Sequence, residues 1–202
     1  MTDLKTRYTD GARRRFFKVG VVLAGLGVTA DMLTITGLLL HAVAVPFIVT
    51  GHFVTAAVIS VIAGVCDALD GAVARAGIGA SKAGAFLDST TDRMSEMLIW
   101  GALVIYMARH ERWYECVAVL VAMGAAQLVS YTRARAEALG VECKVGLMSR
   151  PERIVVLNVG FLFSAWSIGG VSILTIAIYA LAVLTSVTVA QRMLHVMGTL
   201  RP

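Results

Sequence analysis

The chain has 202 residues, of which 58% are hydrophobic and 15% are charged, and its formal net charge is +5. Soluble domains contain about 45–50% apolar and about 25% charged residues. This composition, with a mean hydropathy of +0.79, excludes a disordered chain and a conventional soluble enzyme. Three cysteines, Cys66, Cys116 and Cys143, are too few and too scattered for a disulfide framework or a zinc site. The sequence predicts an all-α, polytopic membrane protein, and nucleic acid is not expected as its partner.

The first 30 residues are basic and then apolar. Six cations precede the uncharged stretch 19–30, which is too short to span a bilayer: Lys5, Arg7, Arg13, Arg14, Arg15 and Lys18. Aliphatic and aromatic side chains are interleaved with these cations, a pattern typical of an amphipathic helix that lies in the interface and is attracted to anionic headgroups. We interpret residues 1–30 as an interfacial helix; a solvated basic tail is the alternative.

Six apolar stretches follow, most of them close to the ~20 residues that cross a bilayer core. They are residues 32–51, 53–74, 84–108, 113–132, 154–171 and 172–190, and an uncharged turn over 166–172 joins the last two. These stretches leave no room for a separate soluble domain. We therefore expect a single membrane domain over residues 1–202, in which residues 31–202 form a core of six transmembrane helices.

The lysines and arginines predict the orientation of these spans. With the N-terminus in the cytoplasm, 16 of the 18 cations fall on the inner side, and only Arg109 and Arg112 fall outside. This one-sided distribution follows the positive-inside rule. We expect a multi-pass protein of the cell membrane with both termini on the cytoplasmic side.

Four aspartates lie within 26 residues in and beside the second and third spans: Asp67, Asp70, Asp88 and Asp92. Charges inside spans are costly and usually functional. The first two are three residues apart and the last two are four apart, which puts each pair on one face of a helix. The connection 76–82 is short, so the two helices are antiparallel neighbours whose acidic faces can meet near the cytoplasmic end. Such carboxylates repel each other and are driven toward protonation unless cations lie between them.

This cluster has the chemistry of a metal site that acts on phosphate. Carboxylate oxygens suit Mg²⁺ or Mn²⁺, and a pair of such ions is the usual equipment for displacement at phosphorus. On the first acidic face, Gly71 and Ala74 leave room for a nucleotide to approach the backbone, and Arg75 supplies a fork for phosphate. Aspartates that merely pair with arginines, an intramembrane aspartyl protease and a cation transporter are the alternatives. The acidic residues outnumber intramembrane partners, a protease needs only two aspartates, and a transporter does not need Arg75.

The pattern Asp67-x2-Asp70-Gly71-x2-Ala74-Arg75-x8-Gly84-x3-Asp88-x3-Asp92 resembles in full the eight-position signature of the CDP-alcohol phosphotransferases. These are six-helix membrane enzymes with an interfacial N-terminal helix, typically homodimers, and the resemblance covers essentially the whole chain. It implies that Asp67, Asp70 and Asp88 bind one divalent ion and that Asp67, Asp88 and Asp92 bind a second. It also implies that Asp92 is the general base on the acceptor hydroxyl. The implied CDP-lipid site consists of Asp31, Met32, Leu33, Thr34, Gly71, Ala74, Arg75, Ser81 and Gly84.

Within this family, residues 130–137 and 150–153 look like those of phosphatidylinositol phosphate synthases of actinobacteria and of related archaeal enzymes. The resemblance implies transfer of a phosphatidyl group from CDP-diacylglycerol to inositol 1-phosphate, with release of CMP. The implied pocket for the acceptor phosphate is formed by Arg133, Arg135, Arg150, Arg153 and Arg192. A dianionic acceptor needs such a cationic pocket, although positive-inside topology alone is an alternative reason for the arginines. Ser149 departs from the acidic residue expected before Arg150, and a phosphatidylglycerol phosphate synthase, which takes glycerol 3-phosphate, is the alternative enzyme.

Overall fold

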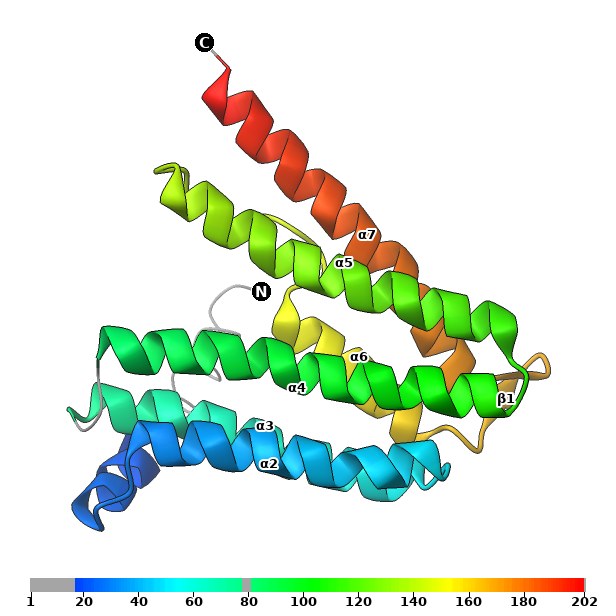
Figure 1. Ribbon diagram of the computed structural model, residues 1–202, viewed down its shortest axis with the longest axis horizontal. Coiled ribbons are helices and arrows are strands. Elements are labelled where there is room, and N and C mark those ends of the chain that lie inside the picture. Colours follow the sequence, from blue (N-terminus) through cyan, green and yellow to red (C-terminus); the bar gives the residue numbers. More distant parts are fainter. Residues whose placement is uncertain (1–16, 78–80, 202) are drawn as a thin grey trace, which may run out of the picture. The chain divides into compact units, whose positions relative to one another are not determined.

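The computed structural model describes residues 17–77 and 81–201, which form helices joined by short connections and one small hairpin (Figure 1). Residues 17–25 are helical, and the labelled helices are α2 (Ala30–Val49), α3 (Phe53–Arg75), α4 (Lys82–Arg109), α5 (Trp113–Ala138), α6 (Arg150–Leu162) and α7 (Ile173–Leu200). Strands β1 (Ser167–Ile168) and β2 (Val171–Ser172) pair antiparallel between α6 and α7. The predicted helical class is confirmed. Residues 1–16, the basic part of the expected interfacial helix, lie outside the described residues.

Four helices of the described chain, α2, α3, α5 and α7, are long and apolar enough to cross a membrane. Large apolar side chains such as Leu39, Val58 and Val183 remain exposed on them, as lipid contact requires. Helix α4 has 28 residues, about 42 Å of helix at 1.5 Å per residue, but its first half is charged. The chain is therefore a multi-pass helical membrane protein.

Helix α6 differs from the stretch predicted for it. Its 13 residues extend only about 20 Å, whereas the apolar stretch was expected to run over 154–171. The helix ends at Leu162 because the chain turns there and enters the β1–β2 hairpin, with Gly169 and Gly170 at φ +57° and +81° in its turn. The residues after Leu162 are still apolar, so hydropathy alone placed the end of this helix too late.

The described chain divides into two compact units. The first comprises the described residues up to Val43 together with Val58–Ser95. In this unit the helix over residues 17–25 packs closely on α3: a Cβ atom added to Gly20 would lie 2.8 Å from the carbonyl carbon of Ala72. Ala24, Ala30 and Val73 form the buried cluster beside this contact. The short helix is thereby fixed against the helix that carries Asp67 and Asp70.

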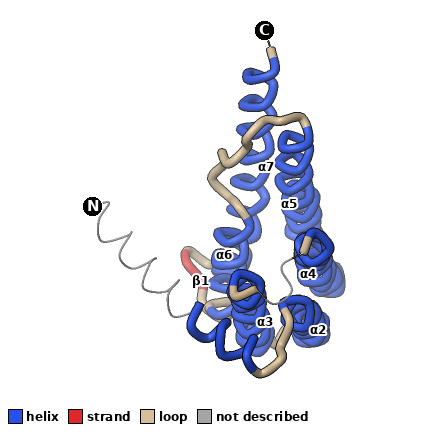
Figure 2. Tube along the Cα trace, turned by 90° about the vertical axis from the view of Figure 1, so that its left-hand side faces the viewer, coloured by secondary structure: helices blue, strands red, loops and turns tan. Residues whose placement is uncertain are grey.

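The second unit comprises Ala44–Ala57 and the chain from Glu96 onward. Helix α7 packs along α5 and α6 in this unit. The ring of Phe53 lies 4.7 Å from that of Tyr106, edge to face, and 5.6 Å from that of Phe161, stacked. Trp100 and Leu103 of the same unit are fully buried. The connection between α5 and α6 has no regular secondary structure (Figure 2).

Candidate active site

A pocket of about 520 Å³ lies in the first unit, where α3 ends and where α2 and α4 begin. Its volume falls within the range of small-molecule sites. Its lining residues are Ala30, Asp31, Thr34, Asp70, Gly71, Ala74, Arg75, Ser81, Lys82, Gly84, Ala85 and Asp88. Seven of the nine residues expected to bind the CDP-lipid are among them, and so are two of the four aspartates. The residues expected to bind the CDP-lipid and the aspartates expected to bind metal thus meet around one cavity.

Two expected residues, Met32 and Leu33, do not line this pocket. Met32 is 55% exposed, and Leu33 packs against the cluster of Ala24, Ala30 and Val73. The expectation treated residues 31–34 as one continuous segment. A helix turns by about 100° per residue, so only the first and the fourth of these residues face the cavity.

Asp70 is held in the pocket by Thr34. The Thr34 hydroxyl donates to Oδ2 of Asp70 over 2.8 Å, and it also lies 3.1 Å from the carbonyl oxygen of Ala30. Both side chains are buried, with Asp70 only 6% exposed. A hydrogen bond to a buried carboxylate is stronger than one between neutral groups. Thr34, expected as a contact of the CDP-lipid, therefore has the additional task of orienting a carboxylate.

Asp67 faces α2 one helical turn before Asp70. A Cβ atom on Gly37 would collide with Oδ1 of Asp67, so a side chain at position 37 would force this carboxylate to move. Gly37 was not predicted as a residue of the site. A glycine on the helix next to an acidic helix face was the available signal in the sequence.

The aspartates have the donor chemistry for Mg²⁺ or Mn²⁺, which prefer carboxylate oxygens. Two of them, Asp70 and Asp88, line the same pocket from α3 and α4. Among the described residues, however, no three His, Cys, Asp or Glu side chains are gathered closely enough to hold one ion. The donor set therefore fits a divalent cation by its chemistry, and the expected three-carboxylate sets remain predictions.

The first turn of α4 supplies positive potential to the pocket. The Ser81 hydroxyl oxygen accepts a hydrogen bond from the backbone N–H of Gly84 over 2.9 Å and so caps the helix. The N-terminus of a helix attracts anions, and Lys82 and Arg75 line the pocket beside it. Lys82 was missed as a site residue because its charge was assigned to topology alone. Its place directly after the capping serine was the available signal.

The five arginines expected to bind the acceptor phosphate all lie in the second unit, but in different environments. Arg133 is exposed and forms an ion pair with Glu137 over 2.8 Å, one turn along α5, and Arg135 is exposed on the same helix. Arg150 is the first residue of α6. Arg153 is buried, and its Nη2 lies 2.8 Å from Oε1 of Glu96.

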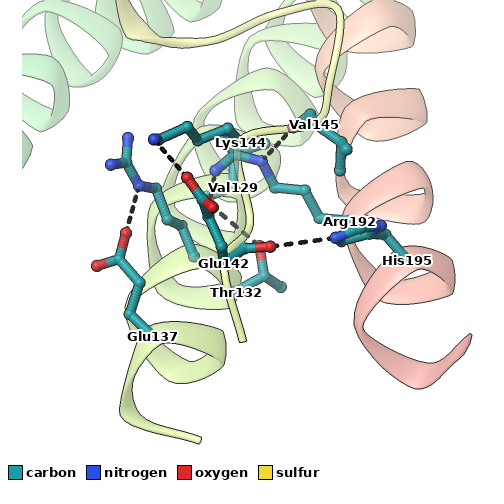
Figure 3. Close-up of polar contacts among 9 residues, drawn as sticks. Val129, Thr132, Glu137, Glu142, Lys144, Val145, Arg192 and His195 are labelled. Atoms are coloured by element: carbon teal, nitrogen blue, oxygen red, sulfur yellow. Dashed lines mark hydrogen bonds and ion pairs between the residues drawn. The ribbon is translucent and has the colours of Figure 1, made fainter. Parts of the chain in front are cut away.

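Arg192 points from α7 to the backbone of neighbouring elements (Figure 3). Its Nε donates to the carbonyl oxygen of Val145 over 2.9 Å, and its Nη1 donates to that of Val129 over 2.5 Å. Nearby, Glu142 and Lys144 form an exposed ion pair, and this contact holds the pKa of the Glu142 carboxyl below its ordinary value. The acidic partners of these cations were not predicted, because one sequence does not tell which distant charges meet.

The fold and the pocket define a helical membrane protein with a small-molecule cavity that is lined by both carboxylates and cations. A model of the CDP-alcohol phosphatidyltransferase family matches residues 27–196, and the chain belongs to this family. The chain is 34% identical over 192 residues to an archaetidylinositol phosphate synthase of Methanothermobacter thermautotrophicus, covering 93% of this chain and 92% of that one. It is 37% identical over 193 residues to a phosphatidylinositol phosphate synthase of Mycobacteroides abscessus, covering 90% and 85%. The predicted family resemblance is confirmed.

Solved structures of a phosphatidylinositol phosphate synthase from Mycobacterium tuberculosis have the same fold. The structure with CDP-DAG bound matches with a TM-score of 0.83 at 30% identity, covering 94% of this chain and 98% of that one. The structure in complex with manganese and citrate matches with a TM-score of 0.82 at 30% identity, covering 93% and 92%.

Proposed function

We propose that this protein transfers the phosphatidyl group of CDP-diacylglycerol to inositol 1-phosphate, which yields phosphatidylinositol phosphate and CMP. One observation carries the proposal: seven residues of the expected CDP-lipid site surround a single pocket together with Asp70 and Asp88. Family membership supports it, and so do relatives named phosphatidylinositol phosphate synthase and archaetidylinositol phosphate synthase.

The donor binds in the pocket of the first unit. Gly71, Ala74 and Gly84 leave its walls without bulky side chains, so that the cytidine can approach the backbone. The pyrophosphate is anionic, and it meets Arg75, Lys82 and the N-terminal end of α4. The acyl chains remain in the surrounding lipid.

The carboxylates would hold two divalent ions, magnesium or manganese. Asp67, Asp70 and Asp88 would bind one ion, and Asp67, Asp88 and Asp92 would bind the other. Bound cations supply the positive charge that offsets the pyrophosphate and the carboxylates. The manganese complex of the homologous synthase from Mycobacterium tuberculosis supports a divalent cofactor.

The protein's own groups then position a substitution at phosphorus. The acceptor hydroxyl oxygen forms a bond to the lipid-side phosphorus, and the bond from that phosphorus to the bridging oxygen breaks, so CMP leaves with the electron pair. Asp92 takes the hydroxyl proton. Positioning and charge stabilisation account for most of the acceleration of such transfers.

The acceptor's phosphate binds to the cationic group of the second unit, formed by Arg133, Arg135, Arg150, Arg153 and Arg192. Arginine forms paired hydrogen bonds with phosphate, which lysine cannot reproduce. Arg150 of this group is the first residue of α6, directly after the stretch that joins α5 to α6.

In the membrane, we infer six spans in a single domain, with both termini on the cytoplasmic side of the cell membrane. The N-terminal helix lies in the interface, since Val21 and Val22 are 47% and 62% exposed while its other face packs on α3. The functional form is a homodimer, as is typical of the family that the sequence resembles.

CMP release by the purified protein tests the proposal. We expect release from CDP-diacylglycerol with inositol 1-phosphate in the presence of magnesium or manganese, and none in excess chelator. Asp67→Asn, Asp70→Asn and Asp88→Asn should each nearly abolish it. Faster release with glycerol 3-phosphate or with free inositol would reject the proposed acceptor, and full activity in chelator would reject the metal site.

A further inference from the structure

The segment 145–149, between α5 and α6, is held by side chains from other elements. Arg192 Nε donates to the carbonyl oxygen of Val145, and the N–H of Leu147 donates to Oε1 of Gln191 over 3.3 Å. The N–H of Met148 donates to the Thr188 hydroxyl oxygen over 3.0 Å. Irregular backbone must find such partners when it is removed from water. Here they fix a segment that has no helix or strand of its own.

Arg153 completes this set from α6. Its Nη1 donates to the carbonyl oxygen of Met148 over 3.1 Å. The rest of the guanidinium faces Glu96: Nε lies 3.0 Å from Oε1, and Nη2 lies 2.8 Å from Oε1 and 2.9 Å from Oε2. These contacts engage all three nitrogens of the guanidinium, so its position is fixed from two sides.

The pair is deeply buried, with Arg153 1% and Glu96 8% exposed. A buried ion pair adds little stability compared with apolar side chains of the same size, but it fixes geometry, and removal of one partner leaves an uncompensated charge. Its bidentate form restricts the position of the guanidinium further. The arrangement therefore suits precise placement of the start of α6 better than general stabilisation.

The position of Glu96 on α4 is also informative. It follows Asp88 and Asp92 at intervals of four residues, so the three carboxylates share one face of this helix. Of the three, Glu96 forms the ion pair with Arg153, one of the arginines proposed to bind the acceptor's phosphate. The helix that carries the proposed metal ligands and base is thus tied directly to α6.

We propose that Glu96 is a positioning residue for the acceptor site. Through Arg153 it fixes the 145–149 segment and the first turn of α6, and so holds Arg150 in place for the acceptor's phosphate. Arg153 itself contributes mainly as the link, because all three of its guanidinium nitrogens already have partners. This inference rests on the proposed function.

Kinetics of Glu96→Gln with inositol 1-phosphate and CDP-diacylglycerol test this role. Glutamine keeps the shape but replaces one acceptor oxygen with a donor that faces Nη2 of Arg153. We expect the KM for inositol 1-phosphate to rise about tenfold to a hundredfold, because a small misplacement of a substrate has effects of this size. The KM for CDP-diacylglycerol should stay unchanged. Glu96→Asp keeps the charge and should recover part of the loss. Glu115→Gln is the matched control, since it breaks the Arg112–Glu115 ion pair away from this segment, and it should leave both KM values unchanged.

An equal change in both KM values, or a loss of thermal stability with no kinetic change, would overturn the positioning role. If Glu96→Gln does not fold, the double variant with Arg153→Gln removes both buried charges and should fold with the raised acceptor KM. A double variant with the wild-type acceptor KM, or one that also fails to fold, overturns the inference. Wild-type protein that releases no CMP with any phosphorylated acceptor would instead reject the proposed function itself.

Discussion

Replacement of Thr34 by valine removes one hydroxyl from the pocket and keeps the shape of the side chain. That hydroxyl donates to Asp70 over 2.8 Å, and both groups are buried. A hydrogen bond to a charged group contributes about 1.5–3 kcal/mol. If the orientation of Asp70 matters fully in the transition state, kcat/KM for CDP-diacylglycerol should fall by roughly 10- to 150-fold, since 1.36 kcal/mol corresponds to a factor of ten in rate.

The measurement is CMP release at varied CDP-diacylglycerol, together with thermal unfolding in detergent. Thr36→Val is the matched control, because Thr36 is exposed and its hydroxyl donates only within α2, to the carbonyl oxygen of Met32. Both variants lose a hydroxyl from the same helix, and only one loses the contact with Asp70. Equal kcat/KM values for the two variants would refute the reasoning.

Three further substitutions probe the same unit. Gly37→Ala should displace the Asp67 carboxylate and lower kcat by up to about a hundredfold, whereas Gly64→Ala, which has open space around its Cβ, should be active; equal activities contradict the contact. Asp92→Asn should lower kcat by about 10²–10⁴-fold and leave binding of CDP-diacylglycerol intact, and near-normal turnover would require another base. Gly20→Ala should lower the free energy of unfolding by about 1–3 kcal/mol because the N-terminal helix is pushed off α3, so unchanged thermal unfolding would speak against that packing.

The sequence predicted the pocket well where helical spacing alone determines which residues share a face. Asp70, Gly71, Ala74 and Arg75 follow one another at such intervals, and all four line the cavity. The prediction was weaker for residues 31–34, all four of which were expected to contact the CDP-lipid, since Met32 is exposed on α2. Periodicity holds within one helix and needs no knowledge of its neighbours.

Contacts between distant elements could not be predicted in this way. Glu96 and Arg153 are 57 positions apart, and nothing local in the sequence couples them. The end of α6 at Leu162 could not be predicted either. The residues that follow are as apolar as a membrane span, although the chain forms a hairpin there. Pairing of charges and the ends of apolar helices both depend on tertiary packing.

Oxygen labelling tests the central claim most directly. Inositol 1-phosphate that carries ¹⁸O in the attacking hydroxyl is incubated with CDP-diacylglycerol, divalent cation and the protein, and both products are analysed by mass spectrometry. Attack on the lipid-side phosphorus predicts that the label is retained in phosphatidylinositol phosphate and that CMP carries none. Label in a cytidine product, or the release of phosphatidic acid in place of the phosphatidyl lipid, would contradict the proposed transfer.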